Sequence, residues 1–101
     1  MNKRDMFMAM TLTHARRAEA RGVVLAVENG EAKLDLLMWD GSCKPLAAPP
    51  PDVMAEIIAA LEAGQTDFTA SVHTVVVERR DIKRTSTGVV ARIFAWSVEQ
   101  L

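Results

Sequence analysis

Three consecutive prolines, Pro49 to Pro51, constrain the fold of this chain more than any other feature of its sequence. Proline interrupts any helix or strand that precedes it, but it is tolerated in the first turn of a helix, where its missing N–H has no partner to lose. The segment that follows, 53–61, has apolar residues at helical spacing, and Asp52 places a carboxylate at the positive end of the helix dipole. Gly64 suits the left-handed turn that ends many helices. We therefore expect a helix that begins at the prolines and closes at Gly64.

The clearest β signal lies before the prolines, where Asn29-Gly30 separates two runs of β-forming residues, 23–28 and 31–39. Asn-Gly favours a two-residue type I′ turn because both central residues must adopt positive φ. Such a turn sets the register of the hairpin. One face should pair Val27 with Ala32, Leu25 with Leu34 and Val23 with Leu36, and the other should pair Glu28 with Glu31, Ala26 with Lys33 and Val24 with Asp35.

The remaining segments indicate one more helix and further strands. In chain order they are an amphipathic helix over 5–21 that Gly22 ends, a short edge strand over 42–46 that contains Pro45, one long strand or two bent strands over 68–80, a polar connection over 81–88 and a last strand over 89–98. The order is thus α-β-β-(β)-α-β-β. It predicts an α+β fold with a mainly antiparallel sheet of about five strands and helices on one side, the general arrangement of PAS-like and profilin-like folds.

Length and composition are those of one small globular domain spanning 1–101. The chain has 101 residues, of which 50% are hydrophobic and 25% charged, close to the globular average. No uncharged apolar run approaches the roughly 20 residues that a membrane-spanning helix needs. The N-terminal segment is a poor match to a signal peptide, and the single Cys43 permits no internal disulfide. We expect a cytoplasmic protein without a membrane span.

Charges of opposite sign are separated along the chain. Residues 1–22 hold five basic residues (Lys or Arg) and two acidic ones. Residues 23–77 hold two basic and eight acidic residues, and residues 78–84 hold four basic and two acidic residues. This separation fits either several solvated faces or a charged contact face for a protein partner. The candidates for a charged contact are Arg79, Arg80, Lys83, Arg84 and Arg92.

The sequence contains no catalytic or metal-binding motif. His14 and His73 are each isolated, without the spacing of a metal site, so we expect structural or surface roles for both. Cys43 with a distant histidine is no specific signal for a nucleophile and its base. Phosphate-binding glycine loops and the nucleophile elbow are also missing. We therefore expect no enzymatic activity, cofactor or metal.

Four large apolar side chains exceed what one face of a thin sheet needs: Leu37, Trp39, Phe94 and Trp96. Aromatic residues are favoured anchors at interfaces, so these four predict a protein contact, with a homodimer as the first expectation. One alternative is a chaperone-like or ligand-sensing module whose open sheet face holds a peptide or a small apolar ligand. Another is RNA or single-stranded DNA binding through the basic residues of 79–84, against which stand the net charge of −1 and the absence of tyrosine.

The layout resembles the PAS-like N-terminal domain that precedes the motor domain in bacterial type II secretion and type IV pilus ATPases. The matching pieces are Ala18-Glu19-Ala20-Arg21-Gly22, the hairpin from Val23 to Trp39, Leu46-Ala47-Ala48-Pro49-Pro50-Pro51 with its helix, and Gly88-Val89-Val90-Ala91-Arg92-Ile93. The motor domain has no counterpart in this sequence. The resemblance implies a PAS-like fold and a non-catalytic, protein-contacting function in or near a secretion or pilus system.

Overall fold

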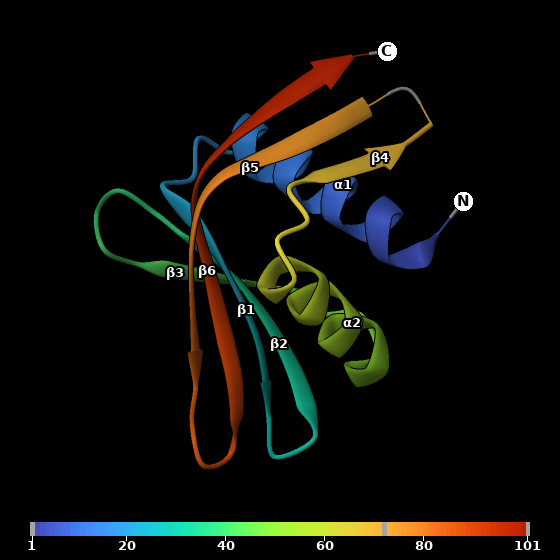
Figure 1. Ribbon diagram of the computed structural model, residues 1–101. Helices are drawn as coiled ribbons and strands as arrows, with labels where there is room; N and C mark the ends of the chain where they lie inside the picture. Colours follow the sequence, from blue (N-terminus) through green and yellow to red (C-terminus); the bar gives the residue numbers. More distant parts are fainter. Residues whose placement is uncertain (1, 72, 101) are drawn as a thin grey trace.

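The computed structural model describes residues 2–71 and 73–100 and has two layers, a strongly bent sheet and two helices (Figure 1). The elements are α1 (Lys3–Arg17), β1 (Gly22–Glu28), β2 (Glu31–Leu37), β3 (Cys43–Leu46), α2 (Pro51–Glu62), β4 (Asp67–Ala70), β5 (His73–Arg84) and β6 (Gly88–Gln100). Within this part of the chain, six strands form one antiparallel sheet in the order β3-β2-β1-β6-β5-β4, and both helices lie on the same side of it (Figure 1). The α+β class is confirmed, with six strands instead of about five.

Helix α2 follows the proline signal closely. It starts at Pro51, has Asp52 in its first turn and ends at Glu62, and Gly64 has a φ of +96°. Its apolar stripe is buried against the sheet through Met54, Ile57, Ile58 and Leu61. This helix was predictable because its start, its stripe and its end are all encoded locally.

The hairpin of β1 and β2 has the predicted register, residue for residue, from Val23↔Leu36 to Glu28↔Glu31. Asn29 and Gly30 have φ values of +52° and +76°, as a type I′ turn requires. Strand β2 ends at Leu37, two residues before the predicted end. The short edge strand is also present as β3, which pairs with β2 and contains Pro45.

Helix α1 is displaced toward the N-terminus relative to the prediction. Asn2 caps it by accepting a hydrogen bond from the Arg4 N–H at 2.8 Å, a signal that the sequence analysis did not use. The helix ends at Arg17, and the chain then turns through Glu19, whose φ is +57°. The prediction that Gly22 ends this helix is therefore wrong. Gly22 is instead the first residue of β1, where a Cβ would lie 2.8 Å from the Ile93 carbonyl oxygen.

The segment 68–80 forms two strands, β4 and β5, and β5 continues well beyond the predicted end. The polar connection expected over 81–88 is wrong, because residues up to Arg84 pair with β6 and only 85–87 connect the two strands. The sequence of this segment shows no alternation of apolar and polar residues, because basic residues occupy both faces of β5. Ile82 packs against the core, whereas Arg80 and the exposed Arg84 reach α2 by hydrogen bonds.

Two register shifts interrupt the β5–β6 ladder, one between Val77 and Arg79 and one between Arg79 and Arg80. Such β-bulges bend a strand pair and re-aim its side chains. The buried residues of β6 accordingly change from Ala91 and Ile93 to Trp96. β1 pairs with β6 only as far as Ile93, and beyond that point β5 and β6 continue over α1 (Figure 1).

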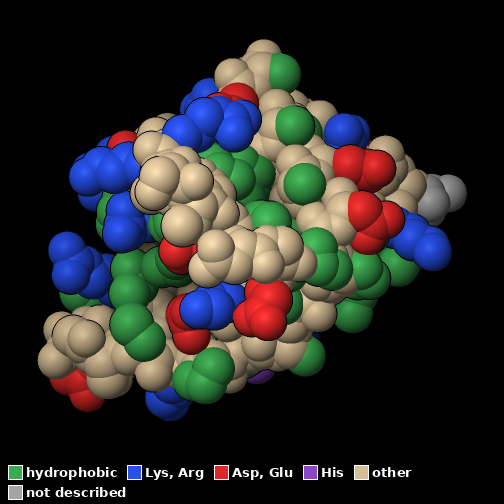
Figure 2. Space-filling view, turned by 90° about the horizontal axis from the view of Figure 1, so that it is seen from below, with side chains coloured by type: hydrophobic (Ala, Val, Ile, Leu, Met, Phe, Trp, Pro, Cys, Tyr) green, Lys and Arg blue, Asp and Glu red, His purple; other side chains and the backbone are tan. Residues whose placement is uncertain are grey.

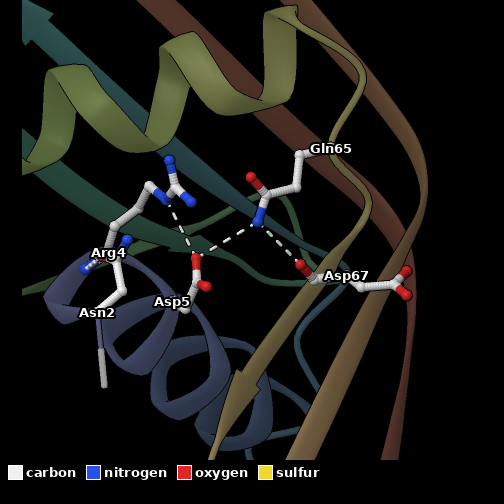
Figure 3. Close-up of polar contacts among 5 residues, drawn as sticks. All are labelled: Asn2, Arg4, Asp5, Gln65 and Asp67. Carbon is white, nitrogen blue, oxygen red and sulfur yellow. Dashed lines mark hydrogen bonds and ion pairs between the residues drawn. The ribbon is translucent and has the colours of Figure 1, made fainter.

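The core lies between the sheet and the two helices. Helix α1 contributes Met8, Ala9, Leu12 and Ala15, which lie beside the buried residues of β4, β5 and β6. The first turn of α1 is also linked to the connection after α2 (Figure 3): Gln65 Nε2 donates to Asp5 Oδ1 at 3.3 Å and to the Asp67 carbonyl at 3.0 Å. Gln65 therefore links the first turn of α1 to the connection between α2 and β4.

The close approach of the two hairpin ends gives a first prediction. A Cβ on Gly88 would overlap the Val27 carbonyl oxygen, so Gly88→Ala must push β6 away from β1. Overpacking of this kind costs about 1–3 kcal/mol or more, and we expect a loss of at least about 2 kcal/mol in the free energy of unfolding by urea. Ser86→Ala, at an exposed position in the same connection, is the control and should change stability by less than about 0.5 kcal/mol. Equal stability of the two variants would contradict the close approach.

Candidate functional site

A groove with a volume of about 1060 Å³ lies where β6 continues beyond the start of β1. We call it the edge groove. Its walls come from the end of α1, the connection 18–21, the turn between β2 and β3, and the bulged part of β5 and β6. Its lining includes Arg16, Glu19, Trp39, Glu78, Phe94 and Trp96. The groove begins where β1 starts at Gly22, because β6 continues past that point with no strand of the described chain beside it on the side that faces away from β5.

The edge groove gathers three of the four side chains that the sequence predicted as an interface: Trp39, Phe94 and Trp96. The fourth, Leu37, lies next to it. Its Cδ1 atom is 3.5 Å, and the Cδ1 atom of Phe94 is 3.7 Å, from the position that a Cβ on Gly22 would occupy. Because glycine has no side chain there, Leu37 and Phe94 approach each other across the start of β1.

Trp39 is the most exposed large apolar side chain described, with 75% of its surface accessible. It sits on the tight turn between β2 and β3, where Met38 N–H donates to the Ser42 carbonyl at 2.9 Å and Gly41 N–H to the Met38 carbonyl at 3.1 Å. A rigid turn therefore presents this indole to solvent at the mouth of the groove. An exposed tryptophan on an ordered turn is typical of an interaction site.

The same turn is held by the carboxylate of Asp40. The Ser42 hydroxyl donates to Asp40 Oδ1 at 2.6 Å and the Ser42 backbone N–H at 2.9 Å, and these hydrogen bonds hold the pKa of Asp40 below its usual value of 3.8. A carboxyl group with a depressed pKa stabilises the fold when ionised and loses this effect as the pH falls through that pKa. The Trp39 turn is therefore fully supported at neutral pH.

Trp96 was predicted to contribute to an exposed interface, but the structure buries it. Only 6% of it is accessible, its Nε1–H donates to the Leu12 carbonyl at 2.9 Å, and the Arg16 guanidinium lies 5.5 Å from the ring centroid. Arg16 also donates to the Trp96 carbonyl oxygen. The bulges turned this side chain toward α1, so Trp96 is the floor of the groove and part of the core.

Phe94 is half-buried and lies on the outer side of the bulge. The Arg79 guanidinium stands over its ring at 5.7 Å from the centroid, the geometry of a cation–π contact. Phe94 and Arg79 therefore form one amphipathic surface beside Trp39. Arginine and aromatic residues are the types enriched in protein interfaces.

The predicted basic cluster is divided between two faces of the sheet. Arg80 Nε donates to the Leu61 carbonyl at 2.9 Å near the end of α2, and Arg84 forms an ion pair with Glu62 of the same helix. Arg79 contacts Phe94 instead, and Arg92 lies 3.8 Å from Asp81. Lys83 is exposed. These five residues do not form one continuous basic surface, and Figure 2 shows acidic and basic side chains interspersed around the hairpin ends.

β6 also has an unpaired edge beside the groove. From Phe94 onward, no strand in the described part of the chain pairs with β6 on the side that faces away from β5. One carbonyl of this edge, that of Trp96, accepts a hydrogen bond from Arg16. An unpaired edge is a template for pairing with another chain, so the groove offers backbone as well as side-chain contacts.

Sequence reasoning missed a second cluster, which contains both histidines. His14, on α1, and His73, at the start of β5, line one pocket of about 300 Å³ together with Thr13 and Arg17. The histidines lie far apart in the sequence, and no local pattern connects them. Only the packing of α1 across β4 and β5 brings them together. Within the described residues, no group of three or more His, Cys, Asp or Glu side chains could hold a metal ion.

Comparison with known families, with curated proteins and with solved structures finds no match to this chain. Neither helix described here is long and apolar enough to cross a membrane.

The two tryptophans should respond differently to substitution. Trp96→Phe removes the buried hydrogen bond from the indole to the Leu12 carbonyl and leaves part of the space of the indole unfilled, so we expect a loss of about 1–3 kcal/mol in the free energy of unfolding by urea. Trp39→Phe replaces an exposed side chain and should change stability by less than about 0.5 kcal/mol. If Trp39→Phe destabilised the protein as much as Trp96→Phe, the assignment of Trp96 to the core and of Trp39 to the surface would be wrong.

Proposed function

We propose that this chain is a non-catalytic protein-interaction module and that its partner binds at the edge groove. The observation that carries the proposal is the 75% accessibility of Trp39 on a hydrogen-bonded turn beside Leu37 and Phe94. Large exposed aromatic groups on rigid elements lose little conformational entropy when a partner covers them. The groove thus has the composition of an interface centre, with Trp39 as its anchor.

The first partner that we propose is a second copy of the chain. The edge groove carries both signs of charge, with Arg16, Arg21 and Lys44 on one hand and Glu19, Asp40 and Glu78 on the other. In a twofold dimer each patch meets its own copy, so a surface with both signs can pair opposite charges across the axis. The unpaired edge of β6 would add backbone hydrogen bonds to such a contact.

We further propose that the module works in or near a bacterial secretion or pilus system. This step rests on the resemblance to the N-terminal domain of secretion and pilus ATPases. It is supported by the element order, in which a helix precedes the Asn29-Gly30 hairpin, and a proline-led helix precedes the last strands. Binding of this chain to a secretion or pilus component, lost in a Trp39→Ala variant, is the observation that would establish it.

Self-association is tested by size-exclusion chromatography with light scattering over a range of concentrations. We expect the wild-type chain to form dimers, and Trp39→Ala to raise the dissociation constant by about 30-fold or more, as for an interface anchor. Met6→Ala removes another exposed apolar side chain, on α1 and outside the groove, and should leave the dissociation constant unchanged. A monomer of 11.1 kDa at high concentration would contradict the homodimer.

A further inference from the structure

The second pocket, between α1 and the hairpin of β4 and β5, is lined by basic and neutral groups alone. Its polar lining consists of Thr13, His14, Arg17 and His73, and an adjoining pocket shares three of these residues and adds Arg16. Among the described residues that line either pocket, none is acidic. The positive charge of the two arginines is therefore not balanced within this cluster.

One polar atom in this cluster has an unfilled hydrogen-bonding capacity. The hydroxyl oxygen of Thr13 is buried and has no hydrogen-bond partner, and Thr13 lines both pockets. Buried hydroxyl groups in folded proteins almost always have a partner, so an exception calls for a physical explanation. The oxygen has less than 1 Å² of accessible surface, so it can meet a ligand in the pocket only after the side chain rotates about its Cα–Cβ bond, and a ligand that draws it out in this way would supply the missing partner.

The charges decide which kind of ligand fits. A metal cation is disfavoured because Arg17 carries a permanent positive charge and cannot act as a ligand. An oxyanion suits the same groups. Arg17 offers several N–H donors and each imidazole offers at least one, and the Thr13 hydroxyl adds one more once it has rotated into the pocket. These donors come from two elements, α1 and β5, so they can surround an anion instead of approaching it from one side.

We propose that this pocket binds the phosphate group of a small phosphorylated molecule. A phosphate group has more acceptor oxygens than a carboxylate and can use four donor groups at once. The volume of about 300 Å³ is at the lower end of the range for small-molecule sites, which leaves room for an organic part beyond the phosphate. The dipole of α1 opposes an anion at this end of the helix, but the basic side chains outweigh its partial charge. This site is separate from the edge groove and does not depend on the proposed function.

The test is a titration of the ¹⁵N-labelled full-length chain, followed by amide shifts in ¹H–¹⁵N spectra. Inorganic phosphate and phosphoserine are added separately, with NaCl used to keep the ionic strength constant. We expect saturable shifts at Thr13, His14, Arg17 and His73. Saturation by both probes shows that the phosphate group is recognised with an organic part attached. Saturation by inorganic phosphate alone supports a site for the free ion and overturns the phosphorylated molecule.

Variants separate a specific site from a general attraction by charge. Arg17→Gln removes a charge-assisted hydrogen bond and should weaken binding by about tenfold or more. Lys33→Gln removes the same charge from an exposed position on β2 and should change the dissociation constant less than about twofold. Failure of both probes to saturate, or equal weakening by the two variants, would overturn the site.

The hydroxyl is tested separately by Thr13→Val, which keeps the shape of the side chain. If the ligand uses this group, the variant should bind phosphate several-fold more weakly while its melting temperature stays equal or rises, because a buried group without a partner has been removed. Unchanged affinity in Thr13→Val would overturn the role assigned to the hydroxyl.

Discussion

The bulged stretch of the β5–β6 ladder is the constraint on which the rest of this structure depends. Within a few residues it turns Trp96 inward onto α1 and leaves Phe94 and Arg79 on the outer surface. Its residues Glu78 and Phe94 also line the edge groove, which lies where β6 continues past the start of β1. The bulged stretch thus contributes both to the docking of the first helix and to the candidate interaction site.

The two helices are held to the sheet by different means. Helix α2 has a full aliphatic stripe, so burial of apolar surface is sufficient to place it. Helix α1 has a thinner face and relies on directional bonds as well, from the Trp96 indole to the Leu12 carbonyl and from Gln65 to Asp5. Arginines support α2 in turn, since Arg80 adds a hydrogen bond to the Leu61 carbonyl, which also accepts from the Gly64 N–H at the end of that helix. The sequence of 79–84 suggests a cluster of surface charges, but Arg80 in this segment contributes to the stability of the fold.

The second half of α1 lies between the two candidate sites. Arg16 borders the edge groove and the pocket that adjoins the histidine cluster, while Thr13 and Arg17 line both pockets on the histidine side. A ligand bound next to Arg17 would thus lie near the residue that holds the Trp96 carbonyl. The last two turns of α1 thus carry residues of both candidate sites.

Local chemistry determined much of this protein in advance. The prolines set where α2 starts, Asn29-Gly30 set the hairpin and its register, and Pro45 marked an edge strand, because each acts on backbone dihedral angles within a few residues. Tertiary structure alone decided the rest. The bulges near Arg79 and Phe94 reversed the alternation that predicts which side chains face outward, so Trp96 became a core residue and the basic cluster was divided. The meeting of His14 with His73 likewise depends on how α1 crosses the sheet, since side chains so far apart in the chain become neighbours only through packing.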